Sequence, residues 1–275
     1  MPFDLAAYLR RIGLNQSVAP TFEVLCALIT HHAGVLPFEN IEVLAGGVPK
    51  LDLASLQGKL VRRGRGGYCF EQNSLFMACL MHIGFTVCAR EARVIAGVPA
   101  GVVTARTHMA LQVSVAGDEF LVDVGFGGLA PLAPLALHST AEQPAGSGMY
   151  RFSEQPHGEL LMQARLFEGW SDCYLLGPGT PRAIDFTMGN WFVATHPTAM
   201  LRSNLLLGRA QAGDGRLTLF NNKLSLRRPQ TAAPEERRLS SRAECGDVLA
   251  DGFGLQLDAP DLDAVMAVIE RHAAA

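Results

Sequence analysis

The sequence predicts an α+β fold, because helical and strand-like patterns occupy different parts of the 275-residue chain. Residues 1–85 place apolar side chains mainly at helical spacing. Residues 86–188 show the alternation of strands, and residues 189–275 combine a hairpin pattern with two closing helices. We therefore expect a helical part, a β part and a mixed part with these bounds.

The first part is expected to hold four helices, over residues 4–12, 22–32, 51–61 and 74–81. Gly13 is a plausible end for the first helix, and Thr21 a plausible cap for the second. His31 and His32 close the second helix. We interpret them as cations at a helix C-terminus, with a metal site as the alternative.

The second part is expected to hold strands at residues 85–95, 107–115 and 120–124, with a weaker β-like pattern over 148–193. Gly117-Asp118 is the predicted turn between the second and third strands. In the third part, Asn221-Asn222 predicts a two-residue hairpin. Helices are expected over 243–249 and 261–272.

Composition argues against several classes of partner and site. The formal net charge is −3, which gives no reason to expect nucleic acid or a membrane as partner. No signal peptide and no apolar run of about 18 residues is visible. Six cysteines include no C-x-x-C pair and no zinc-site spacing. We therefore expect reduced thiols, a cytoplasmic protein, no metal and no tightly bound cofactor. The oligomeric state stays open.

Residues 65–73 are the expected centre of the chemistry, because two glycines and a cysteine precede a buried helix. Gly66 and Gly67 allow a tight turn and a close approach to another group. Cys69 follows at the positive end of the helix dipole, where unsatisfied N–H groups favour a thiolate. We predict that Cys69 is a catalytic nucleophile, and the alternative is a small core residue.

A cysteine nucleophile needs a base and a group that orients the base. His108 begins one predicted strand and Asp123 ends the next, with side chains on the same face. Asp123 lies among apolar residues, and a buried carboxylate needs a partner such as an imidazole N–H. The order Cys, His, Asp is that of papain-like cysteine enzymes. A structural histidine and a turn-forming aspartate are the alternatives.

The predicted turn is a difficulty for this pairing. A turn at Gly117-Asp118 would place Asp123 opposite Gln112, which leaves His108 about 13 Å further along the strand. Direct pairing of His108 with Asp123 requires a hairpin centred between residues 115 and 116, or a bulge.

Six runs resemble the arylamine N-acetyltransferase family: residues 8–13, 37–40, 65–73, 107–109, 122–127 and 190–197. The resemblance implies an N-terminal helical bundle, a central β-barrel and a C-terminal α/β lid around a papain-like core. It implies a catalytic triad of Cys69, His108 and Asp123. It also implies acetyl-CoA as donor, and an arylamine or arylhydrazine as acceptor.

Such acceptors are largely neutral at pH 7, so an apolar pocket can hold them without burying a cation. Its candidate walls, for each of which core packing is the alternative, are Phe38, Phe126 and Phe192. Phe192 stands where a tyrosine is common in the family. The candidate CoA contacts, where the phosphopantetheine arm could pass close to the backbone, are Gly125, Gly127 and Gly128. As a phosphate loop this run is a weak motif.

Arg65 and Glu39 are expected to pair and to brace the nucleophile turn. Residues 97–106 and 136–150 follow no strong pattern and leave the preferred amine open. Cys, His and Asp alone also leave open a related papain-like activity, such as an amide synthase or a cysteine hydrolase. An inert binding module is the third alternative.

Overall fold

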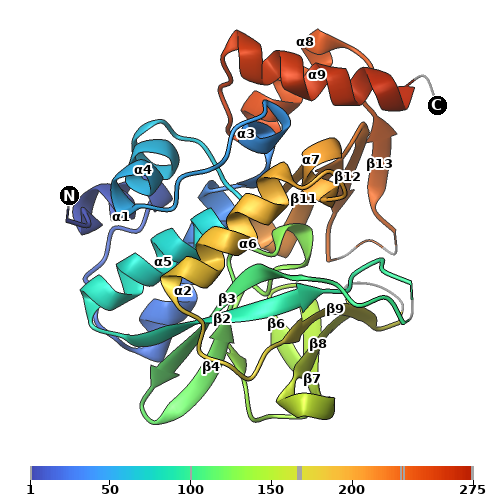
Figure 1. Ribbon diagram of the computed structural model, residues 1–275. Coiled ribbons are helices and arrows are strands. Elements are labelled where there is room, and N and C mark those ends of the chain that lie inside the picture. The colour runs from blue at the N-terminus through green and yellow to red at the C-terminus, as the bar shows by residue number, and fades with distance from the viewer. Residues whose placement is uncertain (1, 100, 166–168, 230, 232, 274–275) are drawn as a thin grey trace.

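The computed structural model describes residues 2–99, 101–165, 169–229, 231 and 233–273, and its fold is α+β (Figure 1). The helices are α1 (Leu5–Ile12), α2 (Phe22–Val35), α3 (Ile41–Leu44), α4 (Leu53–Leu56), η1 (Gln57–Arg62), α5 (Cys69–Ile83), η2 (Gly127–Leu129), η3 (Pro156–Gly158), α6 (Ala183–Thr195), α7 (Met200–Ser203), η4 (Ala212–Asp214), α8 (Arg242–Asp247), η5 (Val248–Gly252) and α9 (Ala259–Ala273). The strands are β1 (Phe38–Glu39), β2 (Thr86–Val94), β3 (Arg106–Val115), β4 (Asp118–Val122), β5 (Leu135–Ala136), β6 (Gln143–Ala145), β7 (Gly148–Glu154), β8 (Leu160–Arg165), β9 (Ser171–Leu176), β10 (Leu206–Gln211), β11 (Gly215–Phe220), β12 (Lys223–Arg227) and β13 (Glu235–Arg238).

The N-terminal helices form where helical spacing predicts them. The side chains of Asp4 and Thr21 accept hydrogen bonds from backbone N–H groups in the first turns of α1 and α2. Gly13 ends α1 in the left-handed region, with φ of 71°. These predictions are confirmed.

The interpretation of His32 as a cation at a helix end is wrong. Its ring is fully buried and lies 2.8 Å from both Tyr8 Oη and Gln72 Oε1. Burial lowers the pKa of His32 to about 4, although the hydrogen bond to Gln72 opposes this shift. The neutral ring therefore links α1, α2 and α5 within the core.

Eight antiparallel strands form the central sheet, in the order β5-β4-β3-β2-β9-β8-β7-β6. The sheet curls until its edge strands β5 and β6 lie close together, which nearly closes a barrel (Figure 1). Ala110 and Tyr150 lie in its interior core, whereas Met109 and Leu111 belong to the core shared with the helices. Strand β3 is therefore buried on both faces.

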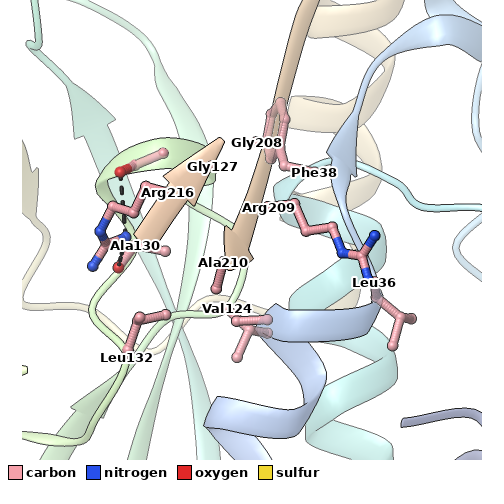
Figure 2. A pocket seen from close by; sticks show the side chains of 12 residues that line it. Leu36, Phe38, Val124, Gly127, Ala130, Leu132, Gly208, Arg209, Ala210 and Arg216 are labelled. Carbon is pink, nitrogen blue, oxygen red and sulfur yellow. Dashed lines mark hydrogen bonds between the residues drawn. The ribbon is translucent and has the colours of Figure 1, made fainter. Parts of the chain in front are cut away.

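A second sheet, β1-β10-β11-β12-β13, forms the C-terminal lid with α8, η5 and α9. The predicted hairpin at Asn221-Asn222 is confirmed, because Phe220 pairs with Lys223. Gly208 lets β10 approach the loop that follows β4: a Cβ there would lie 2.8 Å from Gly128 N (Figure 2). The lid therefore packs directly against the loop that leaves the barrel.

Helix α6 was not predicted. The β-like interpretation of residues 148–193 is confirmed by β7, β8 and β9 and is wrong where α6 begins, from Ala183 onward. The outward side chains Ile184, Met188 and Trp191 are more than 60 % exposed, while Phe186 and Val193 are buried. Because both faces are apolar, the sequence lacks the polar stripe by which a surface helix is recognised.

The three apolar cores correspond to the helices with the outer face of the barrel, the barrel interior, and the lid. The division at 85/86 and 188/189 stays a prediction, and its second boundary falls inside α6.

None of the described helices is long and apolar enough to cross a membrane. All six cysteines lie in the described residues, and each is free.

Candidate active site

Helix α5 begins at Cys69, earlier than the predicted start at residue 74, and the expected place of Cys69 at the amino end of a buried helix is confirmed. Two glycines bring the preceding turn against its neighbours. A Cβ on Gly66 would lie 2.1 Å from Pro37 O, and one on Gly67 would lie 2.7 Å from Glu71 Oε2. Neither position has room for a side chain, so only glycine permits this turn. The turn places Cys69 in the first turn of a buried helix.

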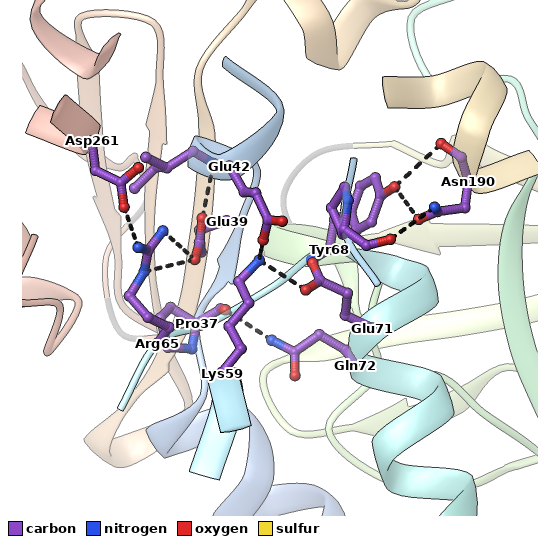
Figure 3. A network of polar contacts seen from close by, with 12 residues as sticks. Pro37, Glu39, Glu42, Lys59, Arg65, Tyr68, Glu71, Gln72, Asn190 and Asp261 are labelled. Atoms are coloured by element: carbon purple, nitrogen blue, oxygen red, sulfur yellow. Dashed lines mark hydrogen bonds and ion pairs between the residues drawn. The ribbon is translucent and has the colours of Figure 1, made fainter. Parts of the chain in front are cut away.

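A buried ion-pair network supports the start of α5 (Figure 3). Lys59 Nζ lies 2.7 Å from Glu42 Oε2 and 2.8 Å from Glu71 Oε1. The other oxygen of Glu71 accepts a hydrogen bond of 3.2 Å from Tyr68 N. Burial raises the pKa of Glu71 to about 7, although Lys59 opposes the shift. Sequence reasoning missed Lys59, because nothing near it in the chain indicates its partners.

Arg65 and Glu39 pair as predicted, with Nη2 2.9 Å from Oε1. Arg65 also pairs with Asp261 at the start of α9. Glu39 Oε2 accepts a hydrogen bond of 2.8 Å from Ile41 N. Through its pairs with Asp261 and Glu39, Arg65 ties the nucleophile turn to the lid as well as to the N-terminal helices (Figure 3).

His108 and Asp123 form a hydrogen-bonded pair, with Nε2 and Oδ2 2.7 Å apart. The exposed fractions are 3 % for His108 and 1 % for Asp123, so the pair is screened from water. Asp123 Oδ1 accepts two more hydrogen bonds, of 3.0 Å from Asn73 Nδ2 and 2.9 Å from Gly125 N. Both oxygens of the buried carboxylate therefore have hydrogen-bond partners.

The turn prediction at Gly117-Asp118 is wrong. The turn lies one residue earlier, and this position removes the expected difficulty in pairing His108 with Asp123. The central residues are Ala116 and Gly117, both with positive φ, as in a type I′ turn. Val115 then pairs with Asp118, which centres the hairpin between residues 116 and 117. Asp123 follows the last paired residue of β4 and reaches His108 diagonally, without direct opposition or a bulge between these strands.

Asn73 and Gly125 connect the nucleophile helix to the aspartate loop. Asn73 lies four residues after Cys69, on the same face of α5. Its amide donates 2.7 Å to Met109 O and accepts 3.2 Å from Val124 N, besides its bond to Asp123. A Cβ on Gly125 would lie only 2.7 Å from Cys69 Cα. Sequence reasoning gave Asn73 no role, although its spacing from Cys69 was the available signal.

Cys69 is 5 % exposed, and its Sγ lies 3.7 Å from Thr107 O. Burial would lower the pKa of His108, but the Asp123 carboxylate and hydrogen bonds to Asp123 and Cys69 raise it overall. His108 and Asp123 are thus brought together, and Cys69 lies beside them with its Sγ against the carbonyl group of the residue that precedes His108. This arrangement allows a thiolate to form beside an imidazolium.

The three phenylalanines proposed as pocket walls lie in different settings. The Phe126 ring centroid is 5.1 Å from that of His108 and 4.9 Å from that of Tyr174. Phe38 lines a pocket beside the loop that follows Asp123 (Figure 2). Phe192 stacks on His196 at the end of α6, with centroids 4.4 Å apart. Of these three phenylalanines, Phe126 is the one whose ring contacts His108, and the Tyr174 ring also lies against His108, with centroids 5.0 Å apart.

The three glycines proposed as CoA contacts face other parts of this chain. The Cβ positions of Gly127 and Gly128 point at the Phe38 ring, at 3.5 Å, and at Thr218 Cγ2, at 2.4 Å. Gly125 faces Cys69 and Asn73. Close packing explains the glycines, and the CoA role stays a prediction. Within the described residues, no group of three or more His, Cys, Asp or Glu side chains could hold a metal ion.

Residues 21–262 match the family model described as N-acetyltransferase. Arylamine N-acetyltransferase of Mycobacterium tuberculosis is 36 % identical over 262 residues, which cover 94 % of this chain and 91 % of that protein. The chain belongs to the arylamine N-acetyltransferase family. The arylamine N-acetyltransferase / N-hydroxyarylamine O-acetyltransferase of Salmonella typhimurium is 35 % identical over 275 residues, covering 98 % and 97 % of the two chains.

Solved arylamine N-acetyltransferases share the fold. The structure of the Mycobacterium marinum enzyme in complex with CoA superposes with a TM-score of 0.90, at 34 % identity, covering 98 % of this chain and 99 % of that one. The Salmonella typhimurium structure gives 0.89 at 34 % identity, covering 96 % and 97 %. The bundle, barrel and lid expected from the resemblance to the arylamine N-acetyltransferases are therefore confirmed.

Proposed function

We propose that this chain transfers the acetyl group of acetyl-CoA to the nitrogen of an arylamine or arylhydrazine, through an acetyl-Cys69 intermediate. The carrying observation is the buried His108–Asp123 pair, 2.7 Å from nitrogen to oxygen, beside Cys69, whose Sγ lies 3.7 Å from the carbonyl oxygen of Thr107, the residue before His108. Membership of the family supports the choice of donor and acceptor.

In the first half-reaction, Cys69 Sγ attacks the carbonyl carbon of acetyl-CoA. A new C–S bond forms, the bond to the CoA sulfur breaks, and CoA leaves as a thiol with a proton from His108. One thioester replaces another, so the acetyl group stays activated. Backbone N–H groups at the start of α5 are the proposed donors to the oxyanion.

In the second half-reaction, the amine nitrogen attacks the acetyl carbon. The N–C bond forms, the bond to Sγ breaks, and His108 accepts the proton of the amine. Asp123 keeps the ring oriented and stabilises its charge. The chain returns to its starting state, and the kinetics are ping-pong.

The test uses purified protein with acetyl-CoA, with and without an aromatic amine. Without the amine, we expect one equivalent of CoA thiol per enzyme and, by mass spectrometry, one acetyl group on Cys69. With the amine, we expect further CoA thiol to be released as the amine is consumed. Cys69→Ala is expected to abolish both without unfolding the protein. Cys88→Ala is the matched control, because Cys88 is exposed on β2.

Other outcomes would contradict the proposal. Transfer that persists above background in Cys69→Ala would exclude this nucleophile. Peptide cleavage without use of CoA would indicate a cysteine hydrolase. An unacetylated Cys69 and no turnover across a panel of amines would indicate a binding module.

Among the acceptor-pocket candidates, Phe126 is supported by its contact with the His108 ring. We expect Phe126→Leu to raise the KM for the amine more than the KM for acetyl-CoA. Phe192→Leu is the comparison variant, since Phe192 stacks on His196. Equal effects of the two substitutions on the amine KM would remove the case for Phe126.

A further inference from the structure

Arg216, on β11, is a buried cation without a carboxylate partner among the described residues. Only 3 % of the residue is exposed. Its Nη1 donates to Gly128 O at 3.2 Å and to Ala130 O at 2.7 Å (Figure 2), and its Nη2 to Tyr150 Oη at 3.1 Å. In the part of the chain that the structure describes, its Nε has no hydrogen-bond partner. Neutral oxygens offset part of a buried charge, and an unmade bond on such a charge is costly.

The surroundings of Arg216 add positive charge. Arg227 stands directly opposite it on β12, and like charges in that position repel. Burial, followed by the charge of Arg216, lowers the pKa of Arg227 to about 10, although Tyr150 and the Glu236 carboxylate oppose the shift. On the other side, β10 carries Arg209, whose Nε donates 2.8 Å to Gly34 O. Burial lowers the pKa of Arg209 as well.

Arg209 and Arg216 both line the pocket beside the loop that follows Asp123 (Figure 2). The other described residues that line it are glycine or apolar, and none of them is acidic. The cavity volume is about 20 Å³. A cavity needs roughly 10–15 Å³ by this measure to hold one water molecule. The space therefore fits one particle of about that size, and a diphosphate is too large for it.

We propose that this pocket is a binding site for one monatomic monovalent anion, of the chloride class, held against Arg216. An anion supplies the charge that the carbonyl and hydroxyl partners lack, and it relieves the repulsion between Arg216 and Arg227. Arg216 holds the carbonyls of Gly128 and Ala130, so the anion stabilises the junction between lid and barrel. The site is distinct from the triad and does not depend on the proposed acetyl transfer.

Bromide is the probe for the first experiment, because its anomalous scattering distinguishes it from water. Crystals of the full chain grown without chloride are soaked in bromide, and data are collected at the bromine absorption edge. We expect an anomalous peak in the pocket, within hydrogen-bonding reach of the Arg216 guanidinium. Bromide at surface positions only, with a water-like density in the pocket, would overturn the proposal.

Thermal unfolding provides the second experiment. The melting temperature is measured in sodium chloride and in sodium gluconate at equal ionic strength. We expect it to rise with chloride and to level off as the site fills, because a ligand that binds only the folded state stabilises it. The same melting temperature in both salts would also overturn the proposal.

Arg216→Gln is expected to remove the chloride-dependent shift. Arg202→Gln is the matched control, since Arg202 is exposed on α7 and should keep the shift. A shift of wild-type size in Arg216→Gln would place the anion elsewhere. If Arg216→Gln does not fold, the bromide and chloride experiments on the unaltered chain still decide the question.

Discussion

Gly125→Ala tests whether close packing between the aspartate loop and α5 positions the triad. The new Cβ would lie 2.7 Å from Cys69 Cα and 2.6 Å from Asn73 Nδ2. An ordinary contact begins at 3.4 Å, so loop and helix must separate by at least about 0.7 Å, the difference between 3.4 and 2.7 Å. Overpacking of this kind costs about 1–3 kcal/mol of stability.

The separation acts directly on the line from Cys69 to His108 to Asp123. A misplacement approaching 1 Å lowers activity by up to about 100-fold, and we expect a loss of about 10- to 100-fold in kcat/KM. The assay is steady-state acetyl transfer, paired with urea unfolding to separate activity from stability. The activity of the remaining folded enzyme should fall by more than the folded fraction does.

Gly246→Ala is the matched control, because a Cβ there meets nothing within 4 Å and the residue lies in helix α8. Alanine in such a position stabilises a helix by about 0.5–1 kcal/mol and should leave kcat/KM unchanged. A Gly125→Ala enzyme as active and as stable as the wild type would refute the reasoning. It would mean that the loop can move away from α5 without disturbing the triad.

Three further predictions concern the groups around the triad. Asn73→Ala removes the hydrogen bonds to Met109 O, Asp123 and Val124 N. We expect the free energy of unfolding in urea to fall by about 2–4 kcal/mol and kcat to fall as well. An unchanged kcat would show that Asn73 does not hold Asp123. Lys59→Met leaves buried Glu71 without its cation and should cost about 3–5 kcal/mol, whereas the double variant with Glu71→Gln should recover part of the loss; equal stability of the single and double variants would contradict this. Burial opposes the charge on His108, yet Asp123 and Cys69 raise the pKa of His108 to about 10. The pKa of an unfolded histidine is about 6.5. The contribution of His108 to stability is therefore complete below about pH 6.5 and is lost as the pH rises through about 10. The difference in unfolding free energy between wild type and His108→Gln should therefore shrink from pH 6.5 to 10, and a difference that stays constant would contradict the raised pKa.

Sequence patterns located most elements because their signals are local. Caps such as Thr21, the alternation along β3 and the Asn221-Asn222 hairpin each depend on residues that are close in the chain. Cys69 was proposed as the nucleophile for the same reason, since glycines, cysteine and helix are contiguous around it.

The missed features depend on contacts between distant segments. Helix α6 is apolar on its exposed side as well as on its buried one. Exposed apolar residues such as Trp191 therefore obscure the hydrophobic periodicity by which a helix is recognised in a sequence. Ala116 adopts positive φ, which an alanine rarely does, so the turn was placed one residue late. Lys59 and Asn73 act on partners that only the folded chain brings near.

The proposed catalytic groups come from two parts of the fold: α5 carries the sulfur from the helical core, and the β3–β4 hairpin and the residue after it carry the imidazole and the carboxylate at the barrel. Either half alone is chemically incomplete, so a nascent or partly melted chain exposes a cysteine without its base. Under the proposed mechanism, reactivity therefore requires that both parts of the molecule have assembled. Thiol modification of Cys69 that depends on the imidazole can therefore serve as a sensor of complete folding.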